Sequence, residues 1–183
     1  MLDEIIPRLF EGNDEAYEKV KGRSGWSWLR AAKYGPGGHA QTLRYHTLSA
    51  PSGPNYLWVR KGNLLALNIL DLDDPEMIPE ELIFKGLDFI HERLAAGDKV
   101  LVACNFGHSR SASLVLMYLR AIGEMPHAVG TSMKLFKKFY PTYSPNHGME
   151  FWTRKLWNEL KDKYLIGPAN QLENIYARPA RSK

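Results

Sequence analysis

The sequence contains a single cysteine, Cys104, among 183 residues. One thiol cannot form a disulfide within the chain, and it excludes a structural zinc site built from several thiolates. Five of the six histidines, at positions 39, 46, 91, 127 and 147, show no spacing typical of metal ligands, so we expect no metal centre. A chain of this length buries enough surface to fold without such a cross-link.

Long hydrophobic runs, internal repeats and low-complexity segments are also missing. The longest strongly apolar run, residues 114–119, is far too short to cross a bilayer. The first ten residues lack the basic and apolar regions of a secretory signal. We therefore expect no membrane span and a cytoplasmic protein, because a free thiol persists in that reducing compartment.

The charge balance shows only a mild excess of one sign. There are 24 lysines and arginines against 20 acidic residues, which gives a net charge of +4. This excess is well short of that of a dedicated nucleic-acid-binding domain, so we expect no nucleic-acid partner. It suits a small anionic substrate equally well.

Strand and helix patterns alternate along most of the chain. Strands are predicted over residues 5–10, 26–32, 64–70 and 99–103, and helices over 14–21, 79–96, 111–122, 127–139 and 148–163. Residues 35–56, rich in glycine, proline and serine, are predicted to form a long irregular loop. The alternation predicts an α/β fold, with a central, mostly parallel twisted sheet flanked by helices. One domain is expected over residues 1–166, followed by a basic tail over 167–183.

The segment from Cys104 to Ser111, here called the cysteine loop, joins the predicted strand 99–103 to the predicted helix that follows. Ligands of such sheets bind beyond the carboxyl ends of the strands. A tight loop that enters a helix directs several backbone N–H groups inward, and these groups can surround an anion. Arg110 adds a planar, two-pronged donor suited to phosphate oxygens.

Cys104 is expected at the floor of this anion site. The helix dipole and the charge of Arg110 favour its thiolate form, which suits attack on a bound tetrahedral phosphorus atom. Ser111 can then donate a hydrogen bond to the sulfur and help it leave. The alternative, a cysteine that merely packs as a small apolar residue, leaves the glycine at +3, the arginine at +6 and the serine at +7 unexplained.

The segment from residue 100 to residue 113 resembles the signature loop of the cysteine-dependent protein tyrosine phosphatases, most closely the dual-specificity branch. The similarity extends to residues 5–13, to the helix and strand before the loop, and to residues 140–149. It implies a dual-specificity phosphatase-like fold and a phosphoprotein phosphatase that works through a cysteinyl-phosphate intermediate without a cofactor. The residues that it implies for phosphate binding are Asn105, Phe106, Gly107, His108, Ser109 and Arg110, with Cys104, Arg110, Asp71 and Ser111 as catalytic residues.

The resemblance also implies a general acid on a loop before the cysteine, here residues 71–78. Asp71 ends an apolar strand, as the family pattern requires, whereas counting back from Phe89 without gaps favours Asp73. We favour Asp71 as the residue that protonates the leaving oxygen. One departure is Ala103, which stands where the family usually has a histidine that lowers the thiol pKa.

The sequence is compatible with more than one substrate class. The sequence does not choose between phosphotyrosine and phosphoserine or phosphothreonine. Related branches use the same loop on phosphoinositides or RNA 5′-phosphates, and a phosphate-binding pseudophosphatase is a further alternative. His108 could contact a second phosphate or face solvent, and Phe106 could stack on an aryl ester or simply pack.

Overall fold

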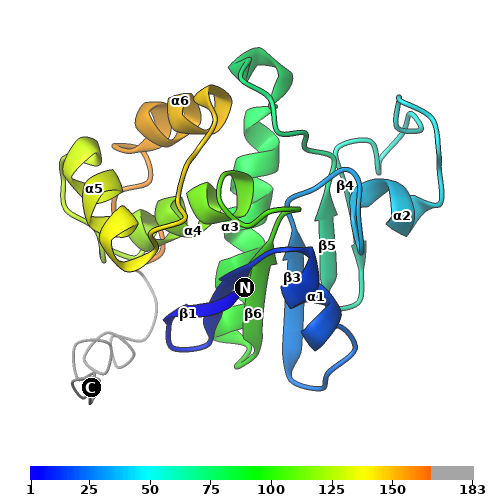
Figure 1. Cartoon of the computed structure of the whole chain (residues 1–183), viewed down its shortest axis with the longest axis horizontal. Helices are drawn as coiled ribbons and strands as arrows, with labels where there is room; N and C mark the ends of the chain where they lie inside the picture. The colour runs from blue at the N-terminus through cyan, green and yellow to red at the C-terminus, as the bar shows by residue number, and fades with distance from the viewer. Residues whose placement is uncertain (166–183) are drawn as a thin grey trace.

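A six-stranded sheet organises the chain (Figure 1). The structure, a computed structural model, describes residues 1–165, so the predicted basic tail lies outside the described residues. The strands are β1 (Leu2–Ile6), β2 (Leu9–Gly12), β3 (Trp26–Arg30), β4 (Trp58–Lys61), β5 (Leu64–Leu67) and β6 (Lys99–Ala103). The helices are α1 (Asp14–Val20), α2 (His39–Leu43), the short 3-10 helix η1 (Pro75–Met77), α3 (Glu80–Ala95), α4 (Arg110–Ala121), α5 (Val129–Phe139) and α6 (His147–Leu156).

The strand order is β1-β2-β6-β3-β5-β4. The four inner strands run parallel to one another, while β1 and β4 pair antiparallel at the two edges. This confirms the predicted central, mostly parallel sheet. The inner strands therefore end on the same side, and the segments that follow β6, β3 and β5 meet there.

Three local predictions were wrong. The strand predicted over residues 5–10 is a hairpin, β1–β2, whose turn contains Arg8 in a left-handed conformation with a φ of 69°. The loop predicted over residues 35–56 contains the short helix α2, and β4 follows it as an edge strand that sequence patterning missed. The last helix, α6, ends at Leu156 and is shorter than the pattern over 148–163 predicted.

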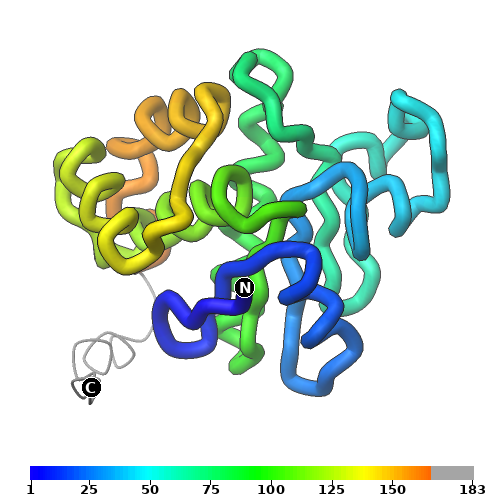
Figure 2. Tube along the Cα trace, in the orientation of Figure 1, coloured from blue at the N-terminus to red at the C-terminus, as the bar shows by residue number. Residues whose placement is uncertain are grey.

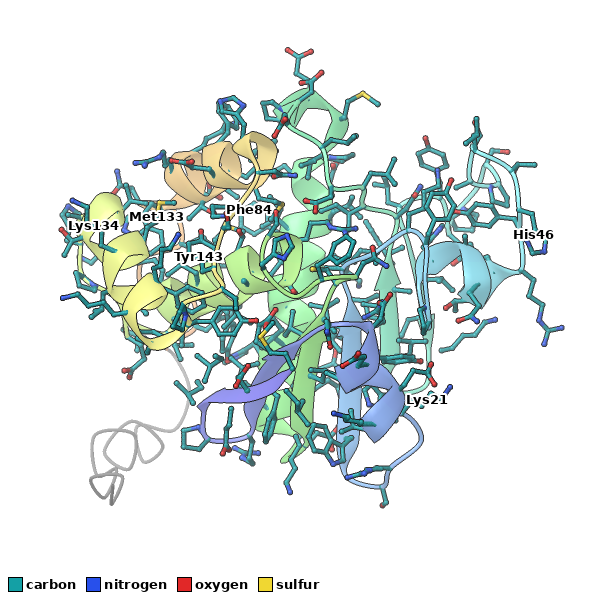
Figure 3. The ribbon with its side chains drawn as sticks, viewed as in Figure 1. Lys21, His46, Phe84, Met133, Lys134 and Tyr143 are labelled. Carbon is teal, nitrogen blue, oxygen red and sulfur yellow. The ribbon has the colours of Figure 1, made fainter. Side chains whose placement is uncertain are left out.

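Alternate side chains of β6 face the two sides of the sheet. Leu101 and Ala103 belong to a small apolar cluster under α1, while Val100 and Val102 join the main core under α3 and α4. Figure 1 shows α1 and α3 on opposite sides of the sheet. Helices α5 and α6 lie beyond α4, and Figure 3 shows Tyr143 directed inward there and Lys134 projecting outward.

Helix α4 is the most enclosed helix of the described chain, with every residue from Arg110 to Ala121 buried. It packs against β6, β2, α3 and α6, which explains why its sequence is apolar on nearly all sides. The chain passes from β6 straight into this helix through the cysteine loop (Figure 2). Its N-terminus is thus fixed at the carboxyl edge of the sheet. Within residues 1–165, no helix has the length and apolar character needed to cross a membrane.

Candidate active site

The cysteine loop wraps its backbone around the sulfur of Cys104. The Gly107 N–H donates a hydrogen bond to Sγ at 3.2 Å, and the Ser111 hydroxyl lies 3.1 Å from it. Gly107 has a φ of 77°, and a Cβ there would lie 3.0 Å from the carbonyl carbon and oxygen of Gly12. The turn therefore requires glycine, both for its conformation and for its close approach to β2.

The surroundings of Cys104 favour a thiolate. Burial by itself would raise the pKa of the thiol, because it removes the charged form from water. The positive charge of Arg110 and the hydrogen bonds from Ser111 and Gly107 outweigh that effect, so the pKa of Cys104 is lowered. A thiolate is the nucleophilic form of cysteine, as the predicted chemistry requires.

Arg110 is buried and held in place from two sides. Its Nη1 donates to the Ile69 carbonyl at 3.2 Å, and its Nη2 donates to Asn105 Oδ1 at 2.9 Å. Its Nε is a buried donor without a hydrogen-bond partner among residues 1–165. A fixed guanidinium with an unused buried donor is suited to an oxyanion, because such a donor is costly to leave unpaired.

The two candidate acids lie in different places. Asp71 Oδ1 lies 3.7 Å from Arg110 Nε and accepts a hydrogen bond from Asn146 Nδ2 at 2.7 Å. Asp73 instead accepts from the His147 N–H at 3.1 Å, at the start of α6. The carboxylate of Asp71 therefore lies beside the candidate phosphate site, and that of Asp73 binds a helix N-terminus.

The other side chains of the cysteine loop serve different purposes. Asn105 Nδ2 donates to Asp14 Oδ2 at 3.2 Å and to the Tyr34 carbonyl at 3.0 Å, which ties the loop to the segment after β3. Ser109 Oγ accepts from the Asn146 N–H at 3.1 Å. Phe106 is 65% exposed and stacks on His108, with ring centroids 5.6 Å apart. The side chains of Asn105 and Ser109 are thus engaged within the protein, so these two residues can offer an anion only their backbone amides, beside the guanidinium of Arg110.

Two charged residues under the loop escaped sequence analysis. Arg30, at the end of β3, is fully buried and donates from Nη1 to the Cys104 carbonyl at 3.3 Å, while Nη2 pairs with Asp14. Glu11, in β2, is fully buried and accepts from the Ser111 hydroxyl at 2.6 Å and from the Tyr140 hydroxyl. In both cases a charged residue lies in a strand that is otherwise largely apolar. This pattern indicates a buried charge with a polar partner, since charged residues are rarely buried without one.

Ala103 is fully buried on the opposite face of the sheet from the main core. It packs in the apolar cluster with Ala16, Tyr17 and Val20 of α1. Because its methyl side chain has no hydrogen-bond donor, Ala103 donates no side-chain hydrogen bond to the cysteine loop. The lowered pKa of Cys104 rests on Arg110, Ser111 and Gly107 instead.

No metal-binding cluster is found in the described part of the chain, where no three His, Cys, Asp or Glu side chains come together in a way that could hold an ion.

Comparison with known proteins identifies the fold. No protein-family model matches the chain, and no curated protein sequence matches it. The chain is similar in structure to DUSP15, with 17% identity, 99% of this chain and 98% of that chain covered, and a TM-score of 0.60. A mouse putative dual specificity phosphatase, solved with zinc tungstate, is 22% identical over 87% of each chain, with a TM-score of 0.59. A human tyrosine phosphatase-like serine/threonine/tyrosine-interacting protein is 20% identical over 86% of this chain and 96% of that chain, also with a TM-score of 0.59.

These similarities establish that the chain has the fold of the dual-specificity phosphatases. The predicted fold class is thereby confirmed. Because one of the similar structures is described as phosphatase-like and interacting, the fold by itself does not settle the activity.

Proposed function

We propose that the protein is a cysteine-dependent phosphoprotein phosphatase of the dual-specificity type. The observation that carries this proposal is the position of the Cys104 thiol. It is buried, its pKa is lowered, and it lies in a loop that also supplies Arg110 with an unused buried donor. Binding an anion needs the loop and the arginine, whereas an activated sulfur is needed only for a covalent step.

In the first chemical step, the Cys104 thiolate attacks phosphorus in line with the ester oxygen. The S–P bond forms while the P–O bond to the substrate breaks. Asp71, beside the site, gives its proton to the departing oxygen. Arg110 and the backbone amides of the cysteine loop hold the remaining phosphoryl oxygens and stabilise their charge.

In the second step, water attacks the cysteinyl phosphate. Asp71, now ionised, takes a proton from the water, and the S–P bond breaks to release inorganic phosphate. Cys104 leaves as a thiolate that receives a hydrogen bond from the Ser111 hydroxyl, 3.1 Å away. The sequence of steps needs no metal and no cofactor.

The substrate that we propose is a phosphorylated protein. The exposed aromatic side chain of Phe106 borders the candidate phosphate site, where it can contact an aryl ester or the surrounding peptide. We propose that residues 1–166 form the catalytic domain. We also propose that the protein is cytoplasmic, because a thiolate nucleophile requires a reducing compartment.

The test is hydrolysis of an aryl phosphate by the wild type and by Cys104→Ser, followed by panels of phosphopeptides and phosphoinositides. We expect turnover by the wild type, none by the variant, and a preference for phosphopeptides. A wild-type protein that binds phosphate without turnover would contradict the proposal and indicate a pseudophosphatase. A preference for phosphoinositides would contradict the substrate class alone.

A further inference from the structure

Glu11 is a buried acidic residue whose protonation state the proposed reaction does not explain. Its side chain is fully buried under the cysteine loop, and none of the ion pairs within residues 1–165 includes it. The groups that act on it are the hydroxyls of Ser111 and Tyr140 and the acidic groups of Cys104 and Asp3. An ionised carboxylate in such a place is costly, because no ion pair with a residue of the described chain compensates for the lost water.

The Ser111 hydroxyl sharpens this problem because it has a single proton. It lies 2.6 Å from Glu11 Oε1 on one side and 3.1 Å from Cys104 Sγ on the other. If Glu11 is ionised, it competes with the thiolate for that proton. If Glu11 is protonated on Oε1, it donates to Ser111 Oγ, and the proton of Ser111 stays directed at the sulfur.

Tyr140 is compatible with the second arrangement. Its hydroxyl contacts both Glu11 Oε2 and the Gly107 carbonyl oxygen. Both of these atoms are acceptors when the proton of Glu11 is on Oε1, so Tyr140 can donate to either. A continuous chain of hydrogen bonds then forms, in which Tyr140 donates to Glu11, Glu11 donates to Ser111 and Ser111 donates to Cys104.

The cluster of Cys104, Ser111, Glu11 and Tyr140 holds one negative charge, and the donors around it determine whether that charge lies on the sulfur or on the carboxyl group. Arg110 and the amides of Gly107 and Ser111 all act on the sulfur of Cys104 and lower the pKa of its thiol. Burial raises the pKa of Glu11 well above its usual range and outweighs the hydrogen bonds from Ser111 and Tyr140, which lower it. The negative charges of Cys104 and Asp3 act in the same direction as burial. The charge is therefore favoured on the sulfur and the proton on the carboxyl group.

We propose that Glu11 is the internal acceptor of the Cys104 proton and, in its protonated form, the positioning residue that directs the Ser111 hydroxyl at the thiolate. The thiol passes its proton to Ser111 Oγ while Ser111 passes its own to Glu11 Oε1. One S–H and one O–H bond break, two O–H bonds form, and the cluster keeps one negative charge throughout. The role of the thiolate as nucleophile rests on the proposed function, but the position of the proton does not.

This arrangement matters most when the cysteinyl phosphate breaks down. Cys104 is 1% exposed, so its sulfur leaves as an anion in a buried position. With Glu11 protonated, the proton of Ser111 is already directed at the sulfur when the S–P bond breaks. An ionised Glu11 would instead place a second negative charge beside the departing thiolate.

Infrared spectroscopy tests the proton position directly in the absence of substrate. Because the chain has one cysteine, an S–H stretching band has a single source. At pH 7 we expect no S–H band, together with a protonated-carboxyl band that is lost in Glu11→Gln. Glu159→Gln, an exposed substitution, serves as the control and should keep the carboxyl band. An S–H band, or no carboxyl band that depends on Glu11, would overturn the proposal.

The pH dependence of iodoacetamide alkylation provides a second readout that a merely structural role would not affect. We expect two steps in the wild type: the rate rises as the thiolate forms, and it changes again at higher pH as Glu11 loses its proton. Glu11→Gln should keep the first step and lose the second. Tyr140→Phe removes one donor to the Glu11 carboxylate, so it should move the second step to higher pH. A second step that persists unchanged in Glu11→Gln would contradict the assignment.

These outcomes separate the two proposals. A protein that shows both infrared signatures but hydrolyses no phosphate ester refutes the proposed function and leaves the proton assignment intact. An active phosphatase with an S–H band at pH 7 refutes the proton assignment alone.

Discussion

Arg110→Lys is the substitution whose cost follows most directly from the geometry. The guanidinium donates to Ile69 and Asn105 through two nitrogens, and its Nε has no hydrogen-bond partner within residues 1–165. Lysine keeps the positive charge but loses the planar fork. Two charge-assisted hydrogen bonds to the phosphoryl group, one from Nε and one from the second N–H of an η nitrogen, each worth about 1.5–3 kcal/mol, would be lost or weakened. A loss of about 3–6 kcal/mol corresponds to a decrease in kcat/KM of about 10²- to 10⁴-fold.

The assay is steady-state hydrolysis of an aryl phosphate, together with the increase in melting temperature that inorganic phosphate produces. In Arg110→Lys, kcat/KM and the increase in melting temperature produced by phosphate should both fall, because the same donors bind the phosphoryl group in the ground state and in the transition state. Arg154→Lys is the matched control, since this arginine is half-exposed and pairs with Glu150 on the surface of α6. A rate within tenfold of the wild type in Arg110→Lys would refute the assignment of the anion site.

Four further outcomes are expected. Cys104→Ser should abolish turnover but keep phosphate binding in the thermal-shift assay, because the amides and the arginine remain. Asp71→Asn should lower the rate about 10²-fold on an ester with a poor leaving group and much less on a good one, whereas Asp73→Asn should lack this dependence. Excess chelator should leave turnover unchanged, and a loss of turnover would argue against thiolate chemistry. Finally, the pKa of Glu11 is raised in the folded state, so the folded protein holds this proton more tightly than the unfolded chain does. The free energy of unfolding of the wild type, relative to that of Glu11→Gln, should therefore be greatest below the ordinary carboxyl pKa of 4.5 and should decline as the pH rises toward the folded pKa. Urea unfolding at a series of pH values measures this difference.

The cysteine loop could be predicted from sequence because its chemistry is local. Its glycine, arginine and serine lie within seven residues of Cys104, between a strand and a helix with clear hydrophobic patterns. The β1–β2 hairpin could not be predicted from the sequence, because its turn has no glycine or asparagine and apolar residues continue on both sides of it. Arg8 adopts the left-handed conformation in that turn, which sequence patterns rarely assign to arginine.

Residues that reach the site across the sheet were harder to predict. The contact between Glu11 and Ser111 depends on β2 and β6 being neighbours, with Glu11 opposite Val102 in the register. The choice between Asp71 and Asp73 likewise depends on where α6 begins, because its first amide binds Asp73. The placement of Asp71 beside Arg110 supports the strand argument, and its role as the general acid stays a prediction.

The same long-range contacts affect how the protein acquires its reactivity. Ser111 and Glu11 are 100 residues apart in the sequence, and Tyr140 and Glu11 are 129 apart. Parallel pairing of distant strands forms late, because large loops must close before such contacts form. A newly made or partly unfolded chain therefore carries a cysteine of ordinary reactivity. The surroundings that lower the pKa of the Cys104 thiol exist only when the sheet is complete, so we expect the rate of thiol modification during refolding to report the final folding step.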